Sequence, residues 1–508
     1  MNSLPLLSLI ILVPWAGALL LAALPGLSAR SARATALAFS LSTLGLGLVA
    51  LAGFHPATAG YQFAELHPWI PALNVHYRLG LDGLSLLLVL LTAIISPLAL
   101  AATARGARDT RLLGLLFLVL QGSALGVFLA LDFFHWFIFW ELSLVPAFFL
   151  IKLWGGAGAG RAAYQFVIYT IAGSAFMLLG FAALYAVTGS LDFTELARLG
   201  ANGSLAAQFG PKAIIAVFFG VLLGLAVKVP LFPFHTWLPA AYAEAPTGVS
   251  MFLTGVMSKM GVYGFLRILW PIFPAQLHAA TPWLLTLALG GVVLGAFAAM
   301  KQTDLKRMIA YSSINHLSYC LLALFAVAYA TGRSGYSEAA ATAALAGTIL
   351  QMFNHGLSAA ALFYCVGVLE RRSHGRRGLN DFGGVRTAAP LFAGLCGIAL
   401  FSSLGLPGLN GFVGEFLIFR GVFGLDAGAA AIACLGLLAT AMFLLTFWQR
   451  VFHGPRAGVA AGEFQDLDRS EFMTLLPLVG MMLVFGVLPH LLTNLINPLV
   501  TTWAHPLP

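Results

Sequence analysis

The chain has 508 residues, of which 60% are hydrophobic and only 9% are charged. Soluble domains carry about 25% charged residues, so this composition excludes a water-soluble globule, and it equally excludes a disordered or collagen-like chain. A membrane-spanning helix needs about 20 apolar residues, and this chain can supply about a dozen or more. The sequence therefore predicts a polytopic, all-α membrane protein. We interpret its net charge of +8 as loop residues that set topology, and expect no nucleic-acid partner.

Apolar stretches bounded by charges, proline or glycine predict about 14 transmembrane helices, with no soluble domain between them. The first run has no basic residue before it and contains Pro14, which favours a first span over a cleaved signal peptide. In chain order the predicted spans cover about 6–24, 34–54, 84–103, 112–131, 133–151, 163–187, 213–234, 247–270, 283–300, 308–330, 339–368, 388–423, 427–447 and 472–492.

The basic residues orient these spans. Loops after odd-numbered spans hold 18 of the 26 Lys and Arg residues, against 6 in loops after even-numbered spans. Positively charged loops face the cytoplasm, so both termini are predicted on the non-cytoplasmic side. Within one odd loop, Arg371, Arg372, Arg376 and Arg377 form a cluster that we interpret as a topology signal or a lipid-headgroup contact.

A few ionisable residues fall inside the predicted spans. Each charge at mid-bilayer costs about 2.5–3.5 kcal/mol of insertion free energy. Such a cost is hard to explain unless the charged group forms an ion pair, is solvated by water or has a function. A purely structural tie between helices is the alternative, but buried ion pairs contribute little net stability, so a functional interpretation is favoured. The residues are Glu141 in span 5, Lys228 in span 7, Lys259 in span 8, His316 in span 10, His355 in span 11 and Glu415 in span 12.

Two of the spans, 7 and 12, carry residues that break helices. Proline removes a hydrogen-bond donor and clashes with the preceding turn, and broken helices at membrane depth are a pointer to an ion site. The two breaks lie five spans apart, which predicts an inverted repeat of five-helix bundles over spans 4–8 and 9–13. The breaking residues are Pro230 and Pro233 in span 7, and Gly405, Pro407 and Gly408 in span 12.

The repeat divides the chain into four predicted parts. Residues 1–104 would hold spans 1–3, and residues 105–270 the first five-helix repeat. Residues 271–452 would hold the second, inverted repeat, and residues 453–508 span 14.

Buried Lys and Glu side chains can exchange protons with water chains, because burial disfavours their charged forms. If Glu141 faces Lys228, moving that carboxylate away would favour proton release from the lysine. His316 and His355 would act as intermediate carriers. The sequence has no glycine-rich nucleotide loop, haem-attachment pair, iron–sulfur cysteine run or metal-ligand spacing. We therefore expect no metal, no cofactor and no catalytic residue of redox chemistry in this chain.

Six runs of sequence carry a family resemblance. They are FWELSLVP, KVPLFPFHTWLPAAYAEAPTGVSM, GVMSKMGVYGFLR, QTDLKRMIAYSSINHLSY, FNHGLSAAALF and GLPGLNGFVGEF. Together they resemble the antiporter-like membrane subunits of respiratory complex I, over residues 80–450. Within this family the chain most resembles the M-type (chain 4) branch of NADH–quinone oxidoreductase. The discriminating position is Glu415, where the L and N branches and the Mrp-type antiporters usually have Lys.

The resemblance implies a proton-translocation role for each buried residue. Glu141 would tune Lys228, the proton-carrying lysine at the first break, and Lys259 would connect the path on span 8. His316 and His355 would continue the polar axis to Glu415, the exit-side carrier.

The resemblance also implies the surroundings of the chain. Partners would be L- and N-like membrane subunits, the subunits that form the quinone site, and lipid. FMN, iron–sulfur clusters and quinone are expected in those partner subunits, where NADH oxidation would be coupled to quinone reduction. The location would be a bacterial-type inner membrane or an equivalent energy-converting membrane.

Other classes stay open at this point. They are a subunit of an Mrp-type sodium/proton antiporter, of a membrane-bound hydrogenase or of an inorganic-carbon uptake complex. A single-chain permease has no supporting feature beyond the broken helices.

Overall fold

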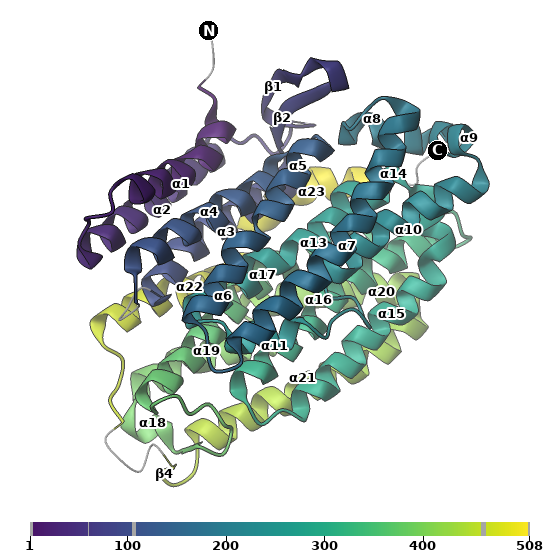
Figure 1. The fold of residues 1–508 in the computed structure, drawn as a ribbon. Helices are drawn as coiled ribbons and strands as arrows, with labels where there is room; N and C mark the ends of the chain where they lie inside the picture. Colours follow the sequence, from purple (N-terminus) through teal and green to yellow (C-terminus); the bar gives the residue numbers. More distant parts are fainter. Residues whose placement is uncertain (1–3, 59, 104–107, 459–463, 506–508) are drawn as a thin grey trace.

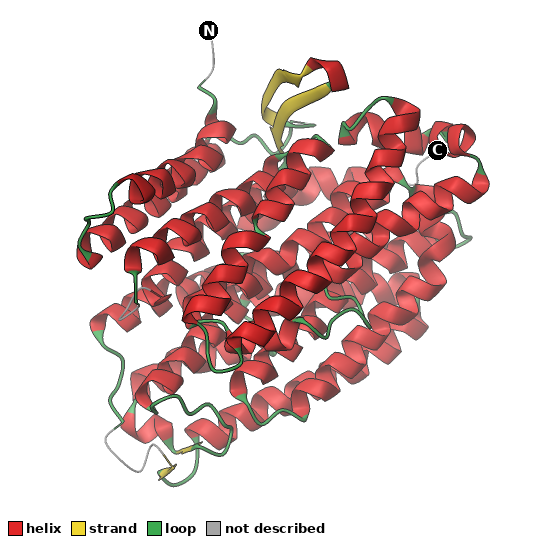
Figure 2. Ribbon diagram, in the orientation of Figure 1, coloured by secondary structure: helices red, strands yellow, loops and turns green. Residues whose placement is uncertain are grey.

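A computed structural model describes residues 4–58, 60–103, 108–458 and 464–505, and it is a bundle of mostly long helices (Figures 1 and 2). Thirteen helices in this part of the chain are long and apolar enough to cross a membrane. The predicted twelfth span is present as two shorter helices, α19 and α20, with a break between them. The polytopic helical fold is thus confirmed, while the count of 14 spans stays a prediction.

The N-terminal part holds three long helices and a hairpin that the all-α prediction missed. The strands of the hairpin pair antiparallel, with Leu66 opposite Arg78, and Asn74 in the turn adopts a positive φ of 50°. In chain order the elements are α1 (Leu6–Ala23), α2 (Ala29–Ala52), β1 (Gln62–Ile70), the 3-10 turn Pro71–Leu73, β2 (Val75–Leu81) and α3 (Gly83–Thr103).

The next part contains the first predicted break. Helix α10 ends at Lys228 and α11 begins ten residues later, at Leu238. The elements are α4 (Thr110–Leu129), α5 (Phe133–Leu142), α6 (Leu144–Trp154), α7 (Ala159–Thr188), α8 (Phe193–Ala201), α9 (Ser204–Phe209), α10 (Pro211–Lys228), α11 (Leu238–Glu244), α12 (Thr247–Phe252), α13 (Ser258–Gly264) and α14 (Trp270–Ile272). The π-helical segments Leu253–Met257 and Phe265–Leu269 join α12, α13 and α14 into one continuous helix.

The remaining part contains the second break, and ends in a helix that the span prediction missed, α23. The elements are α15 (Pro274–Met300), α16 (Leu305–Ala330), α17 (Glu338–Arg372), β3 (Phe382–Gly383), α18 (Val385–Ala388), α19 (Pro390–Ser403), α20 (Asn410–Leu425), α21 (Ala427–Phe452), β4 (Ala457–Gly458), α22 (Arg469–Val487) and α23 (His490–Ala504). Strands β3 and β4 pair antiparallel.

Three helices form the centre of the bundle. The most apolar windows of 247–272 and of α17 are wholly buried, and that of α16 is 94% buried, although most other spans face outward with half their residues or more. These three helices carry Lys259, His316 and His355. The ionisable residues therefore lie in the best-shielded part of the protein.

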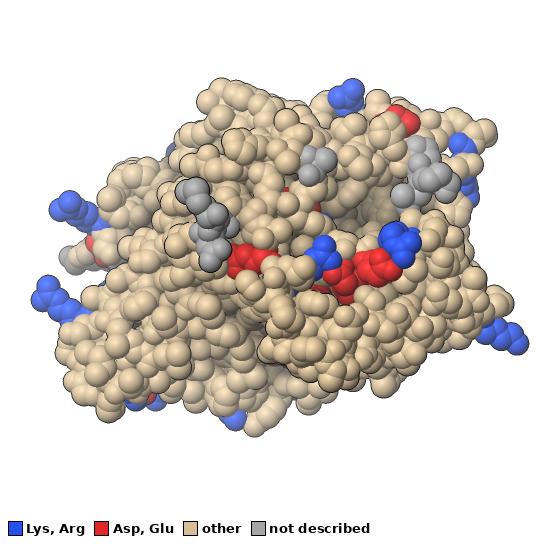
Figure 3. Space-filling model, turned by 90° about the horizontal axis from the view of Figure 1, so that it is seen from above, with Lys and Arg blue, Asp and Glu red and all other residues tan. Residues whose placement is uncertain are grey.

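The bundle has two distinct ends (Figure 1). We call one the hairpin end: it holds β1–β2, α8 and α9, and both ends of the described chain lie there. Leu7 near the start donates its backbone N–H to Glu65 of the hairpin, and Tyr336 donates to the carbonyl of Ala504. Seen from above, most of this side is uncharged, with acidic and basic side chains close together near its middle (Figure 3).

We call the opposite end the arginine end, since it holds residues 370–377, α18 and β4. Three arginines of the predicted cluster have acidic partners within the protein. Arg371 and Arg372 both pair with Glu471 of α22, and Arg377 pairs with carboxylates from other helices. The interpretation as a topology signal or headgroup contact is therefore incomplete for these three residues, because each is held by an acidic partner in the protein.

Candidate functional site

The first helix break leaves a lysine at the end of a helix inside the bundle. Lys228 is the last residue of α10, and its side chain is 3% exposed. Trp237, in the break, donates its indole N–H to the carbonyl of Val227 at 3.0 Å. The proline pair Pro230 and Pro233 that predicted the break lies inside it, so the tryptophan takes the place of a helical donor that the chain no longer supplies.

The second break positions a carboxylate. Gly405 and Gly408 adopt φ values of +78° and +93°, a region that favours glycine, and Pro407 lies between them. A Cβ on Gly405 would lie 2.7 Å from Oε2 of Glu415. The Glu415 side chain thus folds back from α20 against the interrupted backbone and is 5% exposed.

Four of the predicted residues form one row of contacts through the centre. The Lys259 amine lies 2.8 Å from Nδ1 of His355. The rings of His355 and His316 lie 5.2 Å apart, centroid to centroid. Nδ1 of His316 lies 3.0 Å from Oε1 of Glu415. A base, two imidazoles and an acid are therefore arranged in sequence, and protonatable groups at such distances can pass a proton with small side-chain movements.

Neighbouring polar groups tie this row together. Gln351, one helical turn before His355, contacts Nδ1 of His316 at 3.3 Å and donates to Glu415 at 3.2 Å. Lys259 also donates to the carbonyl of Thr254 at 2.5 Å. Sequence reasoning did not single out Gln351, and the available signal was an amide side chain four positions before a histidine, on the same face of a mostly apolar span.

Lys228 and Glu141 lie apart from this row. The Lys228 amine makes no hydrogen bond to any described residue, and lies over the ring of Trp140, 5.0 Å from its centroid. Glu141 and Lys228 interact electrostatically, but they form no ion pair within the described residues. The Glu141 carboxylate instead interacts with the hydroxyl of Ser174, which also accepts the Trp140 indole N–H at 3.0 Å.

A small cavity separates Lys228 from the helix that carries Lys259. It has a volume of about 10 Å³, and its lining includes Lys228, Tyr242 and Ser258. A cavity of this size is at the lower limit of what one water molecule needs, and most of its wall is apolar. Ser258 lies 3.2 Å from the Lys259 amine, so a single water at this place would join Lys228 to the row.

Arg267 is a further buried charge, which the tally of basic residues included among the loops although it falls within the predicted span 247–270. It lies instead in the π-helical segment before α14, is 6% exposed, and pairs with Asp82 at 2.5 Å. It also donates to the hydroxyl of Tyr61 at 2.9 Å. This pair lies eight residues along the helix from Lys259, so counting Arg267 with the loops was wrong, and Asp82 compensates its buried charge.

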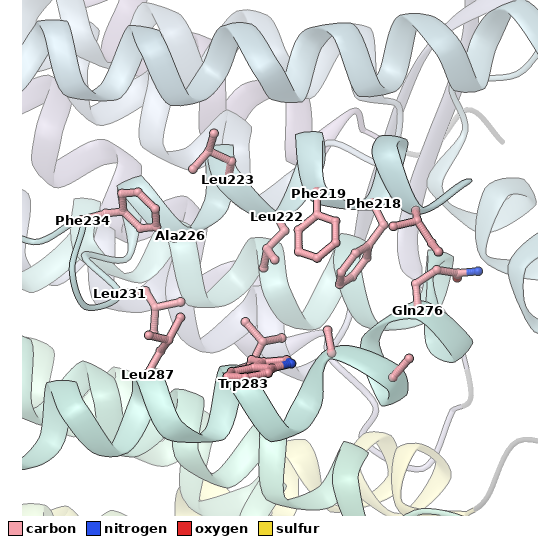
Figure 4. A pocket seen from close by; sticks show the side chains of 14 residues that line it. Phe218, Phe219, Leu222, Leu223, Ala226, Leu231, Phe234, Gln276, Trp283 and Leu287 are labelled. Atoms are coloured by element: carbon pink, nitrogen blue, oxygen red, sulfur yellow. The ribbon is translucent and has the colours of Figure 1, made fainter. Parts of the chain in front are cut away.

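An apolar groove away from these charges lies on the outer surface of the bundle (Figure 4). It measures about 540 Å³ and lies between α10 and α15, with Phe219 and Trp283 pointing into it and Gln276 at its edge. Trp283 is 77% exposed, as expected of a surface that faces lipid. Within the described residues no group of His, Cys, Asp and Glu side chains is placed to hold a metal ion.

Comparison with known proteins identifies the family. The transmembrane family NADH:quinone oxidoreductase/Mrp antiporter matches residues 130–442. The chain belongs to this family. It is 36% identical to NADH-quinone oxidoreductase subunit M of Mycobacterium tuberculosis, over 98% of this chain and 94% of that one. It is also 36% identical to F(420)H(2) dehydrogenase subunit M of Methanosarcina mazei, over 96% and 95% of the two chains.

A solved structure agrees with this assignment to the antiporter-like family. A chain of respiratory complex I from Thermus thermophilus superposes with a TM-score of 0.85 at 31% identity, over 99% of this chain and 100% of that one. The matched segment 130–442 contains all six predicted residues, both breaks and Gln351. The protein is therefore an integral membrane protein with the fold of the complex I antiporter-like subunits.

Proposed function

We propose that this chain is the M-type, proton-translocating membrane subunit of an NADH–quinone oxidoreductase. The observation that carries the proposal is the buried contact row from Lys259 through His355 and His316 to Glu415. The similarity to named M subunits of such complexes supports the same conclusion. In this proposal the chain performs no redox chemistry itself, and acts as the translocase part of a larger enzyme.

The residues take different roles. Lys228, at the end of α10, is the proton carrier of the first break, and Glu141 tunes it. Lys259 receives the proton across the small cavity beside Ser258, and the two histidines pass it on. Glu415, held against Gly405, is the carrier on the exit side. A carboxylate there, rather than a lysine, favours this function over an Mrp-type antiporter.

The chain would work as two halves between partner subunits. The helix breaks α10/α11 and α19/α20 support the inverted repeat over residues 105–270 and 271–452, and residues 1–104 and 453–508 would flank it. L- and N-like subunits and the quinone-site subunits are the proposed neighbours. FMN, iron–sulfur clusters and quinone would be held by partner subunits.

The proposed orientation places the arginine end in the cytoplasm. Most loop Lys and Arg residues belong to loops at that end, and basic loops are retained on the cytoplasmic side. Both termini then lie on the non-cytoplasmic side of a bacterial-type inner membrane or its equivalent.

The test uses the assembled complex in inverted membrane vesicles. Lys228→Ala should abolish most NADH-driven acidification of the vesicle interior while the complex still assembles, because the cavity loses its proton carrier. Lys212→Ala is the matched control, since Lys212 is exposed near the start of the same helix α10. Normal acidification by an assembled Lys228→Ala complex would refute the proposal.

A further inference from the structure

A cluster of five charged residues at the arginine end is not used by the proton path. It consists of two basic residues, Lys306 and Arg377, and three acidic ones, Glu244, Asp304 and Glu370. We call it the α11 joint. Its members come from four different parts of the chain: the end of α11, the start of α16, the end of α17 and the loop after α17.

Arg377 is the centre of the joint. Its guanidinium donates to Oε1 of Glu244 at 2.9 Å and contacts Oδ2 of Asp304 at 2.7 Å. It also donates to the carbonyl of Ala243 at 2.7 Å, and lies 3.6 Å from Glu370. One planar guanidinium thus contacts α11, the N-cap of α16 and the end of α17, a geometry that a lysine amine cannot reproduce.

Lys306 makes a second connection between the same helices. Its amine lies 2.7 Å from Oε2 of Glu370 and donates to the carbonyl of Ala245, just beyond α11, at 3.4 Å. Its side chain is 3% exposed, so this ion pair is shielded from solvent on one side. Glu244 also accepts the backbone N–H of Gly158 at 2.9 Å, which connects the loop between α6 and α7 to the joint.

The helices held by the joint are those that carry the proposed proton carriers. Helix α11 follows the break at Lys228, and α16 and α17 carry His316 and His355. Lys306 and His316 are ten residues apart on α16, about 15 Å at 1.5 Å per residue. A displacement of α11 at the joint would therefore move two rigid helices whose imidazoles must stay in register.

We propose that the α11 joint, with Arg377 at its centre, is a positioning device that couples movement at the Lys228 break to the alignment of His316 and His355. This inference rests on the proposed proton-translocating function. Arg377 itself carries no proton in this scheme. Its role is to keep α11 and the α16–α17 pair moving together, so that a movement at the Lys228 break and a realignment of His316 and His355 occur in one step.

The experiment compares Arg377→Met with Arg371→Met in the assembled complex. Arg371 is a matched control, because it forms an ion pair at the same end, but with Glu471 of α22 and not with α11. Both variants are assayed in inverted vesicles for NADH oxidation and for protons moved per NADH oxidised. We expect Arg377→Met to lower the proton-to-NADH ratio with little loss of NADH oxidation, and Arg371→Met to leave the ratio unchanged.

Further variants keep the inference falsifiable. If Arg377→Met fails to assemble, Glu244→Gln decides, because it keeps the shape of the side chain and removes only its charge. Arg377→Lys should restore part of the ratio. If Lys228→Ala blocks pumping, but the proton-to-NADH ratio is unchanged in assembled Arg377→Met or Glu244→Gln, the proposed role of the α11 joint is refuted. If Lys228→Ala pumps normally, the proposed function itself fails.

Discussion

The second helix break gives the most specific prediction. Gly405→Ala adds one methyl group at a position with a φ of +78°, where the new Cβ would lie 2.7 Å from Oε2 of Glu415. The left-handed conformation costs an L-residue about 1–2 kcal/mol. The contact is shorter than van der Waals packing allows, and the carboxylate is the flexible partner, so we expect Glu415 to be displaced.

The functional cost follows from the contact that the displacement removes. Oε1 of Glu415 lies 3.0 Å from Nδ1 of His316, and a shift of more than about 0.5 Å takes it out of hydrogen-bonding range. Hydrogen bonds to charged groups contribute about 1.5–3 kcal/mol. At 1.4 kcal/mol per factor of ten, we expect proton transfer past Glu415 to slow by about 10- to 100-fold.

The assay is NADH-driven acidification of inverted vesicles, with the amount of assembled complex measured in parallel. Gly408→Ala is the matched control: its φ of +93° carries the same backbone cost, but nothing lies within 4 Å of its Cβ. Gly405→Ala should therefore lose pumping that Gly408→Ala retains. Equal pumping by the two assembled variants would refute the claim that Gly405 positions Glu415.

Two further predictions concern stability. Glu471→Ala removes the shared partner of Arg371 and Arg372, and should destabilise the protein by up to about 3 kcal/mol. The measurement is the melting temperature, which should fall. An unchanged melting temperature would contradict a structural role for these pairs. Burial raises the pKa of Asp132, and this effect outweighs the hydrogen bond that its carboxylate accepts from the backbone N–H of Phe134. The folded protein therefore favours the protonated carboxyl. Asp132 contributes to stability at acidic pH, and this contribution is lost as pH rises through the raised pKa. Asp132→Asn keeps an N-cap side chain and should stabilise the protein at neutral but not at acidic pH; an equal effect at both would contradict this.

The sequence was sufficient for features that depend on local chemistry. Proline and glycine patterns predicted both breaks, because their backbone constraints act wherever the residue lies. The cost of a charge in lipid singled out Lys259 and Glu415 without knowledge of their partners. The hairpin β1–β2 was missed because its two strands lie between predicted spans 2 and 3 and were interpreted as a loop.

Long-range pairing lay beyond sequence reasoning. Arg267 was counted with the loops, but its carboxylate partner Asp82 is 185 residues away in sequence. Arg371 and Arg372 likewise have their partner far away in sequence, since Glu471 lies about 100 residues further on. A basic residue near the end of a span looks the same in the sequence whether its side chain is solvated or pairs with a distant carboxylate. Only the fold distinguishes the two cases.

The two lysines of the proposed proton path differ in a way that makes Lys228 the one whose protonation Glu141 can control. Lys259 has hydrogen bonds to Thr254 and Ser258 and a contact with His355, which compensate its burial. Within the described part of the chain, Lys228 has only the rings of Trp140 and Phe166, and a desolvated cation–π contact supplies about 2 kcal/mol, which is comparable with the 2.5–3.5 kcal/mol that its charge costs at mid-bilayer. The charged and neutral forms of Lys228 are thus close in free energy. An approach or retreat of Glu141 is enough to decide that balance, whereas Lys259 would need several contacts to change at once.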